Sequence, residues 1–223
     1  MNTKLFLSAI AKFAAGVILI GALLFLPAGT LHYPQGWLLM GILFIPMFLA
    51  GLVMMAKNPA LLKSRLNAKE KEREQSLVVK LSGLMFLVGF ILAGLSFRFG
   101  WLMLPRWVSI VGAALFLMSY ALYAEVLREN TWLSRTIEVQ EGQTVVSTGL
   151  YGIVRHPMYA VTLVLFLSMP LVLGSWLSLA VLLAYPFIIA ARIRDEERVL
   201  MEGLPGYADY TQRVRWRLIP FIW

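Results

Sequence analysis

The sequence predicts an all-α integral membrane protein, on the grounds of its composition, the length of its apolar blocks and the charge of its loops. The chain has 223 residues, of which 60% are hydrophobic and 14% are charged. Soluble domains are about half apolar and about a quarter charged, so a soluble fold of this size could not bury the apolar excess. The mean hydropathy of +0.76 agrees. The same composition excludes disordered, collagen-like and coiled-coil chains.

Residue counts also limit the chemistry that the chain can perform. It contains no cysteine, which excludes disulfides, Cys-ligated zinc, iron–sulfur clusters and cysteine nucleophiles. Its two histidines, His32 and His156, are expected on opposite sides of the membrane, so no metal site is predicted. The net charge of +8 indicates basic loops at an anionic leaflet, and no nucleic-acid partner is expected.

Four apolar blocks, each carrying at most one charge, are long enough to span a membrane. They cover residues 9–29, 36–56, 77–97 and 107–127. A helix of about 20 residues crosses a hydrocarbon core of about 30 Å, so each block predicts one transmembrane helix.

A fifth block, from Met158 to Ala191, has no charge and is too long for one straight helix. Such a helix would exceed the bilayer by about 20 Å at about 1.5 Å per residue. Gly174 and Ser175 lie at its middle, which favours two helices, about 158–173 and 175–192, joined as a hairpin. A single bent and strongly tilted helix is the alternative.

Loop charges orient the helices. Lysines and arginines gather in residues 57–76, in 128–157 and after 191, whereas 30–35 has none and 98–106 has two. The positive-inside rule places the N-terminus and the three basic segments in the cytoplasm. An even number of crossings between 128–157 and the tail requires the hairpin, which gives about six transmembrane helices. The expected location is the bacterial inner membrane, with both termini and the active site cytoplasmic.

The chain is expected to have two regions. Residues 1–127 form a four-helix transmembrane region, and 128–223 form a catalytic region of a cytoplasmic loop, the hairpin and a helical C-terminal segment. The first block is expected to be a retained anchor, with a signal peptide cleaved after Ala28 as the alternative. The mixed charge run at 63–76 is expected to be a solvated helical loop.

A first polar cluster lies at the entrance of the hairpin. Arg155 and His156 directly precede Pro157, which suits the first turn of a helix because its missing N–H costs nothing there. Free helix N–H groups and a guanidinium together favour a carboxylate or phosphate. Gly149 and Gly152 allow close approach to a ligand. The alternative is a positive-inside arginine beside a hydrogen-bonded loop histidine. Tyr151 and Tyr159 belong to the same cluster.

A second cluster lies where the hairpin ends. Glu196 and Glu197 follow Arg192 and Arg194, with which they could pair within the helix. In the functional reading one of the two carboxylates holds a cationic ligand group. Tyr207 and Tyr210 are spaced to share a helical face, where they would stack on a flat ring or lie at the lipid interface. Since a hairpin returns the chain to its entrance, the two clusters should meet. Together they suit a zwitterionic nucleotide-like ligand such as S-adenosylmethionine.

The two clusters resemble the isoprenylcysteine carboxyl methyltransferase family and its phospholipid methyltransferase-like bacterial relatives. The resemblance covers about residues 128–220 and rests on GLYGIVRHPMY, RDEERVL and PGYADYTQRVRWRLIP. It implies a membrane methyltransferase that uses S-adenosylmethionine and acts on a lipophilic small molecule or lipid. It further implies three catalytic residues, a cofactor-binding set and Arg213 beside the substrate entrance. The catalytic residues are Arg155, His156 and Tyr159; the cofactor-binding residues are Gly149, Tyr151, His156, Pro157, Tyr159, Glu196, Glu197, Tyr207 and Tyr210.

The sequence departs from the family pattern in places that concern the acceptor. Ala160 and Val161 follow Tyr159, where the family commonly has a glycine, and the usual Arg-x-Pro-Arg of the tail is replaced by residues 213–217. Carboxylate O-methylation and lipid amine N-methylation therefore both remain open. Two other functions are retained: an NADPH-dependent sterol-type reductase, and a non-enzymatic membrane protein that binds lipid or a partner through its basic segments.

Overall fold

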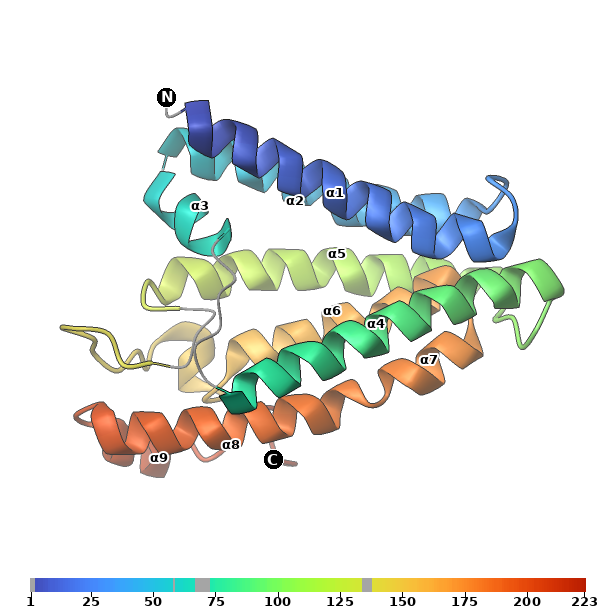
Figure 1. The fold of residues 1–223 in the computed structure, drawn as a ribbon. Coiled ribbons are helices and arrows are strands. Elements are labelled where there is room, and N and C mark those ends of the chain that lie inside the picture. The colour runs from blue at the N-terminus through green and yellow to red at the C-terminus, as the bar shows by residue number, and fades with distance from the viewer. Residues whose placement is uncertain (1–2, 58, 67–72, 134–137) are drawn as a thin grey trace.

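The computed structural model describes residues 3–57, 59–66, 73–133 and 138–223, and within them the chain is helical. The helices in chain order are α1 (Thr3–Ala28), α2 (Pro34–Lys57), α3 (Pro59–Leu66), α4 (Arg73–Phe99), α5 (Arg106–Glu129), η1 (Gly149–Gly152), α6 (Pro157–Leu173), α7 (Trp176–Leu182), α8 (Tyr185–Gly203) and α9 (Tyr207–Arg213). Figure 1 shows the long helices running side by side, with α3 and α9 at one end of the bundle.

Five helical segments are long and apolar enough to cross a membrane. They are Leu5–Ala28, Pro34–Lys57, Val78–Phe99, Arg106–Glu129 and Trp176–Gly203. Helix α6 is a shorter apolar helix of 17 residues. The predicted class, an all-α multi-pass membrane protein, is confirmed. Part of the charge run at 63–76 falls in α3, but 67–72 lie outside the described residues, as does Arg135 of the predicted cytoplasmic loop.

The predicted hairpin is confirmed, and the single bent helix is wrong. Helix α6 ends at Gly174, whose φ of 69° is the left-handed conformation that glycine adopts without strain. Ser175 then caps α7 by accepting a hydrogen bond from the amide of Ser178 at 3.2 Å. The hydroxyl of Ser175 also donates to Ser96 of α4 at 2.9 Å. The turn is thereby fixed to the neighbouring helix as well as by its own backbone.

The second half of the hairpin differs from the expected helix 175–192. It is broken after Leu182 and restarts as α8, with Pro186 in the first turn, where its missing N–H removes a hydrogen bond from the preceding turn. Helix α8 then continues beyond 192 to Gly203. Glu196 and Glu197 are therefore on a helix that is continuous with the membrane hairpin.

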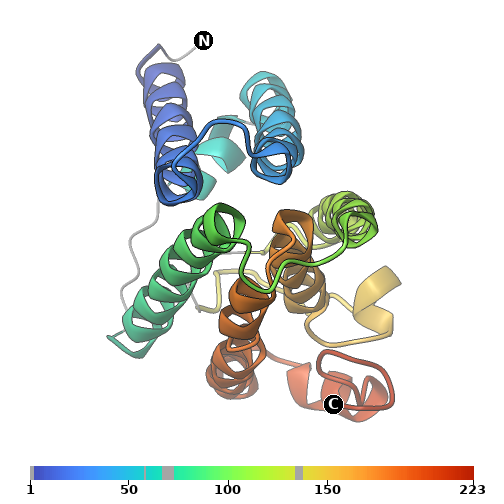
Figure 2. The same cartoon turned by 90° about the vertical axis from the view of Figure 1, so that its right-hand side faces the viewer.

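Helices α5 and α6 are closely packed along one another. A Cβ added at Gly112 would lie 2.8 Å from Cβ of Leu171 and from the amide nitrogen of Val172. Glycine therefore lets the two backbones approach, as small residues do in membrane helix pairs. Helices α1 and α2 lie at the edge of the bundle (Figure 2), where α1 packs on α4 so closely that a Cβ added at Gly94 would lie 2.5 Å from the Leu24 carbonyl oxygen, and where the Tyr120 hydroxyl of α5 donates to the Leu43 carbonyl of α2.

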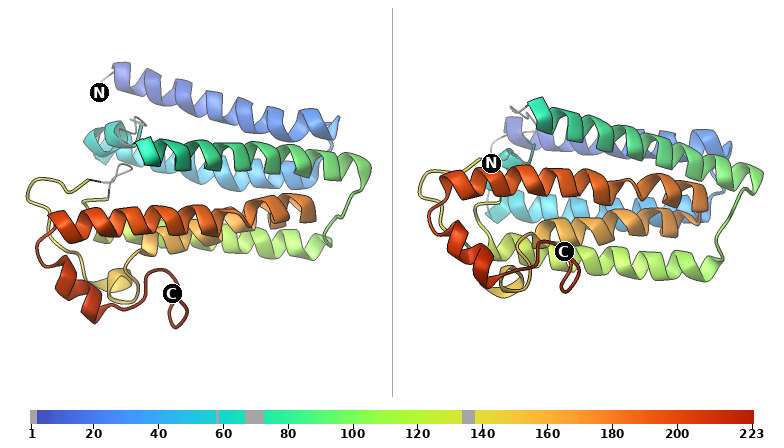
Figure 3. Two further views of the ribbon diagram at one scale, coloured as in Figure 1. Left: turned by 60° about the horizontal axis from the view of Figure 1, so that its bottom comes forward. Right: turned by 90° about the horizontal axis from the view of Figure 1, so that it is seen from below.

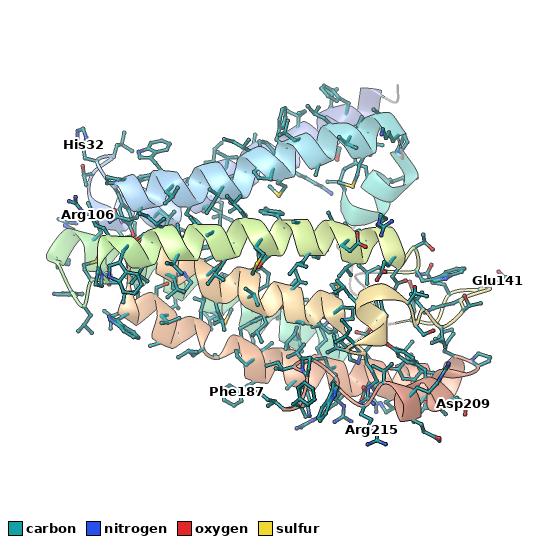
Figure 4. The ribbon with its side chains drawn as sticks, turned by 180° about the vertical axis from the view of Figure 1, so that it is seen from behind. His32, Arg106, Glu141, Phe187, Asp209 and Arg215 are labelled. Carbon is teal, nitrogen blue, oxygen red and sulfur yellow. The ribbon has the colours of Figure 1, made fainter. Side chains whose placement is uncertain are left out.

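The bundle has two chemically different ends. The segment before α6, which contains η1, and the segment after α8, which contains α9, lie at one end, whereas the α1–α2 and α4–α5 loops lie with the hairpin turn at the other (Figure 3). Figure 4 shows the same division by residue, with His32 and Arg106 at one end and Glu141 and Asp209 at the other. Both predicted polar clusters therefore lie at one end of the bundle.

Candidate active site

The start of α6 is fixed to the chain that follows α9. His156 is the N-cap of α6, and Pro157 occupies its first turn, as the sequence predicts. The backbone amides of Arg155 and His156 donate to the carbonyls of Trp216 and Arg217 at 2.8 and 2.9 Å. Segments about 60 residues apart in the chain thus meet through main-chain bonds, which do not depend on side-chain identity.

Glu197 is the centre of a buried ion cluster. Its Oε1 lies 2.7 Å from Nε of Arg155 and 3.2 Å from Nε2 of His156, and its Oε2 accepts from Nε of Arg217 at 2.7 Å. The side chains of Arg155 and Glu197 are 9% and 11% exposed. A buried carboxylate needs partners of opposite charge, and Glu197 has two guanidinium partners. The Arg155 guanidinium is therefore paired with a protein carboxylate, although the sequence predicted that it would help to bind a carboxylate or phosphate of a ligand.

Glu196 faces a different set of groups from its neighbour. Its Oε2 accepts a short hydrogen bond from the hydroxyl of Tyr159, and that hydroxyl accepts from Nε of Arg192 at 2.9 Å. Its Oε1 lies 3.9 Å from Nδ1 of His156, and its side chain is 26% exposed. Glu196 is therefore the member of the pair with open space beside it.

Three tyrosines form an aromatic wall opposite the carboxylates. The Tyr210 hydroxyl donates to the carbonyl of Tyr151 at 2.7 Å, and Asn130 Nδ2 donates to the Tyr151 hydroxyl at 2.9 Å. The rings of Tyr207 and Tyr210 lie 5.7 Å apart. Burial is the first cause that raises the pKa of Tyr151 to about 12, and burial likewise raises the pKa of Tyr207 and of Tyr210. All three phenols are therefore protonated near neutral pH and can donate hydrogen bonds.

The Tyr207 hydroxyl has no hydrogen-bond partner among the described residues, although its side chain is only 4% exposed. Leaving a buried hydroxyl unsatisfied costs about 1–3 kcal/mol. Such a group in a native structure calls for a partner outside the protein chain. The hydroxyl lies at the wall of a cavity, so a bound molecule is the partner that the geometry favours.

That cavity lies between α6, α8 and α9 at the polar end of the bundle. Its mouth is formed by the segment that follows α5, and its walls combine carboxylate, guanidinium, imidazole, phenol and apolar groups. The lining residues are Asn130, Trp132, Leu133, Glu138, Gln143, Thr144, Val145, Val146, Tyr151, Arg155, His156, Met158, Tyr159, Arg192, Glu196, Leu200, Leu204, Tyr207 and Tyr210.

Most of the site residues named from the sequence line this cavity, and four do not. Tyr151, Arg155, His156, Tyr159, Glu196, Tyr207 and Tyr210 are in its walls. Glu197 lies behind the wall in the ion cluster, and Pro157 starts α6. Arg213 is exposed at the end of α9. Gly149 lies at η1, away from the cavity surface.

Gly149 has a structural reason to be glycine. Its φ is +51°, and a Cβ at this position would overlap the carboxylate of Glu129. That carboxylate accepts the amide of Leu150 at 3.0 Å and so fixes η1 to the end of α5. Since η1 carries Tyr151, the Glu129–Gly149 contact positions one wall of the cavity.

Three site residues escaped sequence reasoning. Asn130 supports Tyr151, and Arg217 belongs to the ion cluster. Arg192 was expected only as a helical partner of Glu196, yet it reaches Tyr159 and lines the cavity. The sequence did not single out Arg192 and Arg217 as site residues, because arginines near the cytoplasmic ends of membrane helices are already expected from the positive-inside rule. Among the described residues no group of three His, Asp or Glu side chains is placed to hold a metal ion.

Comparison with known proteins shows what this region is similar to. A family model described as phospholipid methyltransferase matches residues 107–205. The predicted resemblance to these membrane methyltransferases is confirmed. The match extends further toward the N-terminus than the expected 128–220, since it includes α5.

Two curated relatives each match a part of the chain. The cobalt-zinc-cadmium resistance protein CzcN of Cupriavidus metallidurans is 34% identical over 83 residues, which are 37% of this chain and 38% of that protein. The Δ(14)-sterol reductase TM7SF2 of Mus musculus is 31% identical over 91 residues, 40% of this chain and 22% of that protein. The matched segments thus span less than two fifths of either relative.

The fold similarity is broader than the sequence similarity. The solved structure of the eukaryotic intramembrane Ras methyltransferase ICMT, isoprenylcysteine carboxyl methyltransferase, superimposes with a TM-score of 0.59 and 22% identity. The superposition covers 96% of this chain and 77% of that one. The ICMT-like fold therefore includes the N-terminal helices, which the sequence resemblance did not reach.

Proposed function

We propose that this chain is an integral membrane methyltransferase that uses S-adenosylmethionine to methylate a lipophilic acceptor. The observation that carries the proposal is a cavity lined both by Tyr207, whose buried hydroxyl has no partner among the described residues, and by Glu196. The phospholipid methyltransferase match over residues 107–205 supports the reaction type.

The residues present fit this cofactor. S-adenosylmethionine carries a sulfonium and an ammonium group, and two carboxylates line the cavity, Glu196 beside His156 and Tyr159 and Glu138 in the segment after α5. Its carboxylate and ribose are acceptors for phenol, amide and guanidinium donors, and Tyr207, Asn130 and Arg192 are donors there. Its adenine is flat and largely apolar, which suits the tyrosines and the leucines at 200 and 204.

The protein contributes chiefly alignment and exclusion of water. When bound, S-adenosylmethionine supplies an electrophilic methyl group. The Glu197 cluster fixes His156 and Arg155 at the start of α6, and the Tyr210–Tyr151 bond fixes the aromatic wall. Rigid placement of two reactants supplies much of the rate in such reactions. A carboxylate acceptor needs no base, whereas an ammonium acceptor must lose a proton, for which Glu196 Oε1 or His156 Nδ1 is available.

A reductase is the second candidate, and one observation favours it. The match to the mouse Δ(14)-sterol reductase covers 91 residues of this chain. NADPH would need a cationic group to bind its 2′-phosphate. Of the two arginines that line the cavity, Arg155 pairs with Glu197, and Arg192 lies outside that ion cluster. The comparison of adenosyl ligands with NADPH therefore decides between the two functions.

The test is calorimetry of S-adenosylhomocysteine, S-adenosylmethionine and NADPH with the purified chain. We expect saturable binding of both adenosyl ligands and none of NADPH. Tyr207→Phe should weaken binding about tenfold by removing the free hydroxyl, at about 1.4 kcal/mol per tenfold. Its matched control is Tyr120→Phe, because the Tyr120 hydroxyl donates to Leu43 between α5 and α2, away from the cavity.

A second pair of variants tests the carboxylate. Glu196→Gln should abolish binding of the adenosyl ligands, whereas Glu202→Gln, at an exposed position near the end of the same helix, should leave it unchanged. Binding of NADPH alone by the folded chain would overturn the methyltransferase in favour of the reductase. Binding of none of the three would reject both enzymes.

A further inference from the structure

The last ten residues form a hook that folds back along the bundle. The amides of Arg217, Leu218 and Ile219 all donate to the carbonyl of Trp223, at 3.0, 2.9 and 3.1 Å. The Arg217 guanidinium also lies over the Trp223 ring, 5.4 Å from its centroid. Figures 1 and 3 show this segment leaving α9 and running back beside α8 in the direction of the hairpin turn. Residues 214–223 are called the hook below.

The hook presents an apolar tip to its surroundings. Phe221 is 86% exposed and Ile222 is 75% exposed, while Phe187 on the adjacent α8 is 79% exposed. Phe221 also has a φ of 67°, a conformation that non-glycine residues rarely adopt. A cluster of exposed aromatic and aliphatic side chains on a membrane protein is typical of a surface that contacts lipid.

Basic residues lie on the polar side of that tip. Arg213 and Arg215 are exposed. Figure 4 shows Arg215 between Phe187 and Asp209 along the long axis of the bundle, so that apolar, basic and acidic residues follow one another toward the polar end. This is the order in which hydrocarbon, phosphate and water occur at a leaflet. Each Lys or Arg near an anionic surface contributes about 1 kcal/mol of attraction.

The hook is also part of the cavity's support. The carbonyls of Trp216 and Arg217 accept the amides of Arg155 and His156, and the Arg217 side chain pairs with Glu197. Nη1 of Arg155 further donates to the Val214 carbonyl at 3.4 Å. Any interaction that holds the hook in place therefore also holds the start of α6 and two residues of the cavity wall.

We infer that the hook binds an anionic phospholipid leaflet, with Phe221 and Ile222 among the acyl chains and Arg215 at the phosphates, and that this binding orders the start of α6. The inference goes beyond the proposed methyl transfer, since it concerns membrane lipid that is not consumed. It does not depend on which cofactor the cavity takes.

The first experiment measures the depth of the hook. The chain has no cysteine, so Ile222→Cys carries a single spin label in nanodiscs of phosphatidylcholine with about 30% phosphatidylglycerol. We expect the label to be accessible to oxygen and protected from a water-soluble nickel complex. Leu26→Cys, 76% exposed in the parent on α1, is the hydrocarbon control, and Glu202→Cys is the water control. Free access of the nickel complex to position 222 would overturn the proposal.

The second experiment measures the coupling without any cofactor. Hydrogen exchange at the Arg155 and His156 amides is compared in nanodiscs of phosphatidylcholine alone and with about 30% phosphatidylglycerol. We expect exchange to be at least threefold slower with the anionic lipid, and this difference to disappear in Arg215→Gln combined with Phe221→Ser. Arg194→Gln, exposed on α8, is the charge control. Equal exchange in the two lipids would overturn the coupling to anionic lipid.

Failure of this proposal is distinguishable from failure of the proposed function. A chain that binds no adenosyl ligand but protects its Arg155 and His156 amides in anionic lipid would refute the enzyme and support the hook. A chain that binds S-adenosylhomocysteine with a water-exposed position 222 would do the reverse.

Discussion

The N-terminal pair α1–α2 and the C-terminal half from α5 to α9 are built from similarly apolar sequence but are held by different interactions. Only 6% of the most apolar window of α1 is buried inside the protein, and 17% of that of α2, against 28% for α4 and for the α7–α8 segment. Figure 2 shows α1 and α2 at the edge of the bundle, each with one side packed on the other helices. Most of the apolar surface of α1 and α2 is therefore not covered by protein and is expected to contact lipid.

Polar contacts separate the two regions still more clearly. Within the N-terminal region Lys12 Nζ donates an exposed bond to the Leu66 carbonyl at 2.7 Å, and two neutral hydroxyl bonds, Tyr33 to Leu173 and Tyr120 to Leu43, join this region to the rest of the bundle. The C-terminal half has the Glu197 ion cluster, the Glu196–Tyr159 bond and the Tyr210–Tyr151 bond. Lipid tails are as apolar as leucine, so burial alone distinguishes protein from lipid neighbours poorly in a membrane. Steric fit and polar bonds therefore determine where helices assemble. Close backbone packing occurs in both regions, at Gly94 against α1 and at Gly112 against α6, whereas the buried ion pairs lie in the C-terminal half.

The largest expected effect comes from the centre of the ion cluster. Glu197→Gln leaves Arg155 and Arg217 buried or half-buried without a counter-charge, and we expect it to reduce the free energy of unfolding by about 3–5 kcal/mol. The measurement is unfolding in mixed micelles. Glu125→Gln is the matched control, since the exposed Glu125–Arg128 pair should contribute nothing measurable. Equal effects of the two variants would contradict the contrast between buried and exposed charge.

A pair of glycines compares packing in the two regions. Gly112→Ala should destabilise by about 1–3 kcal/mol, because its Cβ would meet the α6 backbone at 2.8 Å. Gly41→Ala in α2 has no atom within 4 Å of the added Cβ and should change stability by less than about 1 kcal/mol. Thermal unfolding in the same detergent checks both. A tolerant Gly112 would mean that α5 and α6 separate more easily than their packing implies.

Alkaline pH tests the aromatic wall. Burial raises the pKa of Tyr151 from 10.0 to about 12 in the folded chain, so the unfolded chain loses this proton first. The corresponding stability is complete below about pH 10 and is lost as the pH rises toward about 12. Tyr151→Phe should make the free energy of unfolding fall less over that window, by up to about 2.7 kcal/mol at about 1.36 kcal/mol per pKa unit, which is measured by unfolding at a series of pH values. An unchanged slope in the variant would show that other groups dominate alkaline unfolding.

The smallest effect is expected in the N-terminal region. Lys12→Met removes an exposed hydrogen bond to Leu66 and should lower the free energy of unfolding by less than about 1 kcal/mol. Binding of S-adenosylhomocysteine should be unaffected, because Lys12 does not line the cavity between α6, α8 and α9. A large loss in either measurement would mean that the two regions are more strongly coupled than their contacts show.

The sequence alone determined the class of fold and the place of the site. A long charge-free block with Gly174 at its centre predicts a turn, because such a block exceeds the bilayer and glycine accepts a left-handed conformation. The hairpin then brings the residues before Pro157 near those after Arg192, wherever the other helices lie. The N-terminal helices gave no such information, since a helix that is apolar all round has no preferred face.

Only the tertiary structure decided what each polar residue does at that place. Glu196 and Glu197 are neighbours in sequence, and successive residues on an α-helix point about 100° apart. One of the two therefore had to face the ion cluster and the other the cavity. The rotation of α8 against α6 made Glu197 the partner of Arg155 and left Glu196 beside the open space. That rotation is set by packing along the whole hairpin and by the chain after α9, which no local pattern of residues encodes.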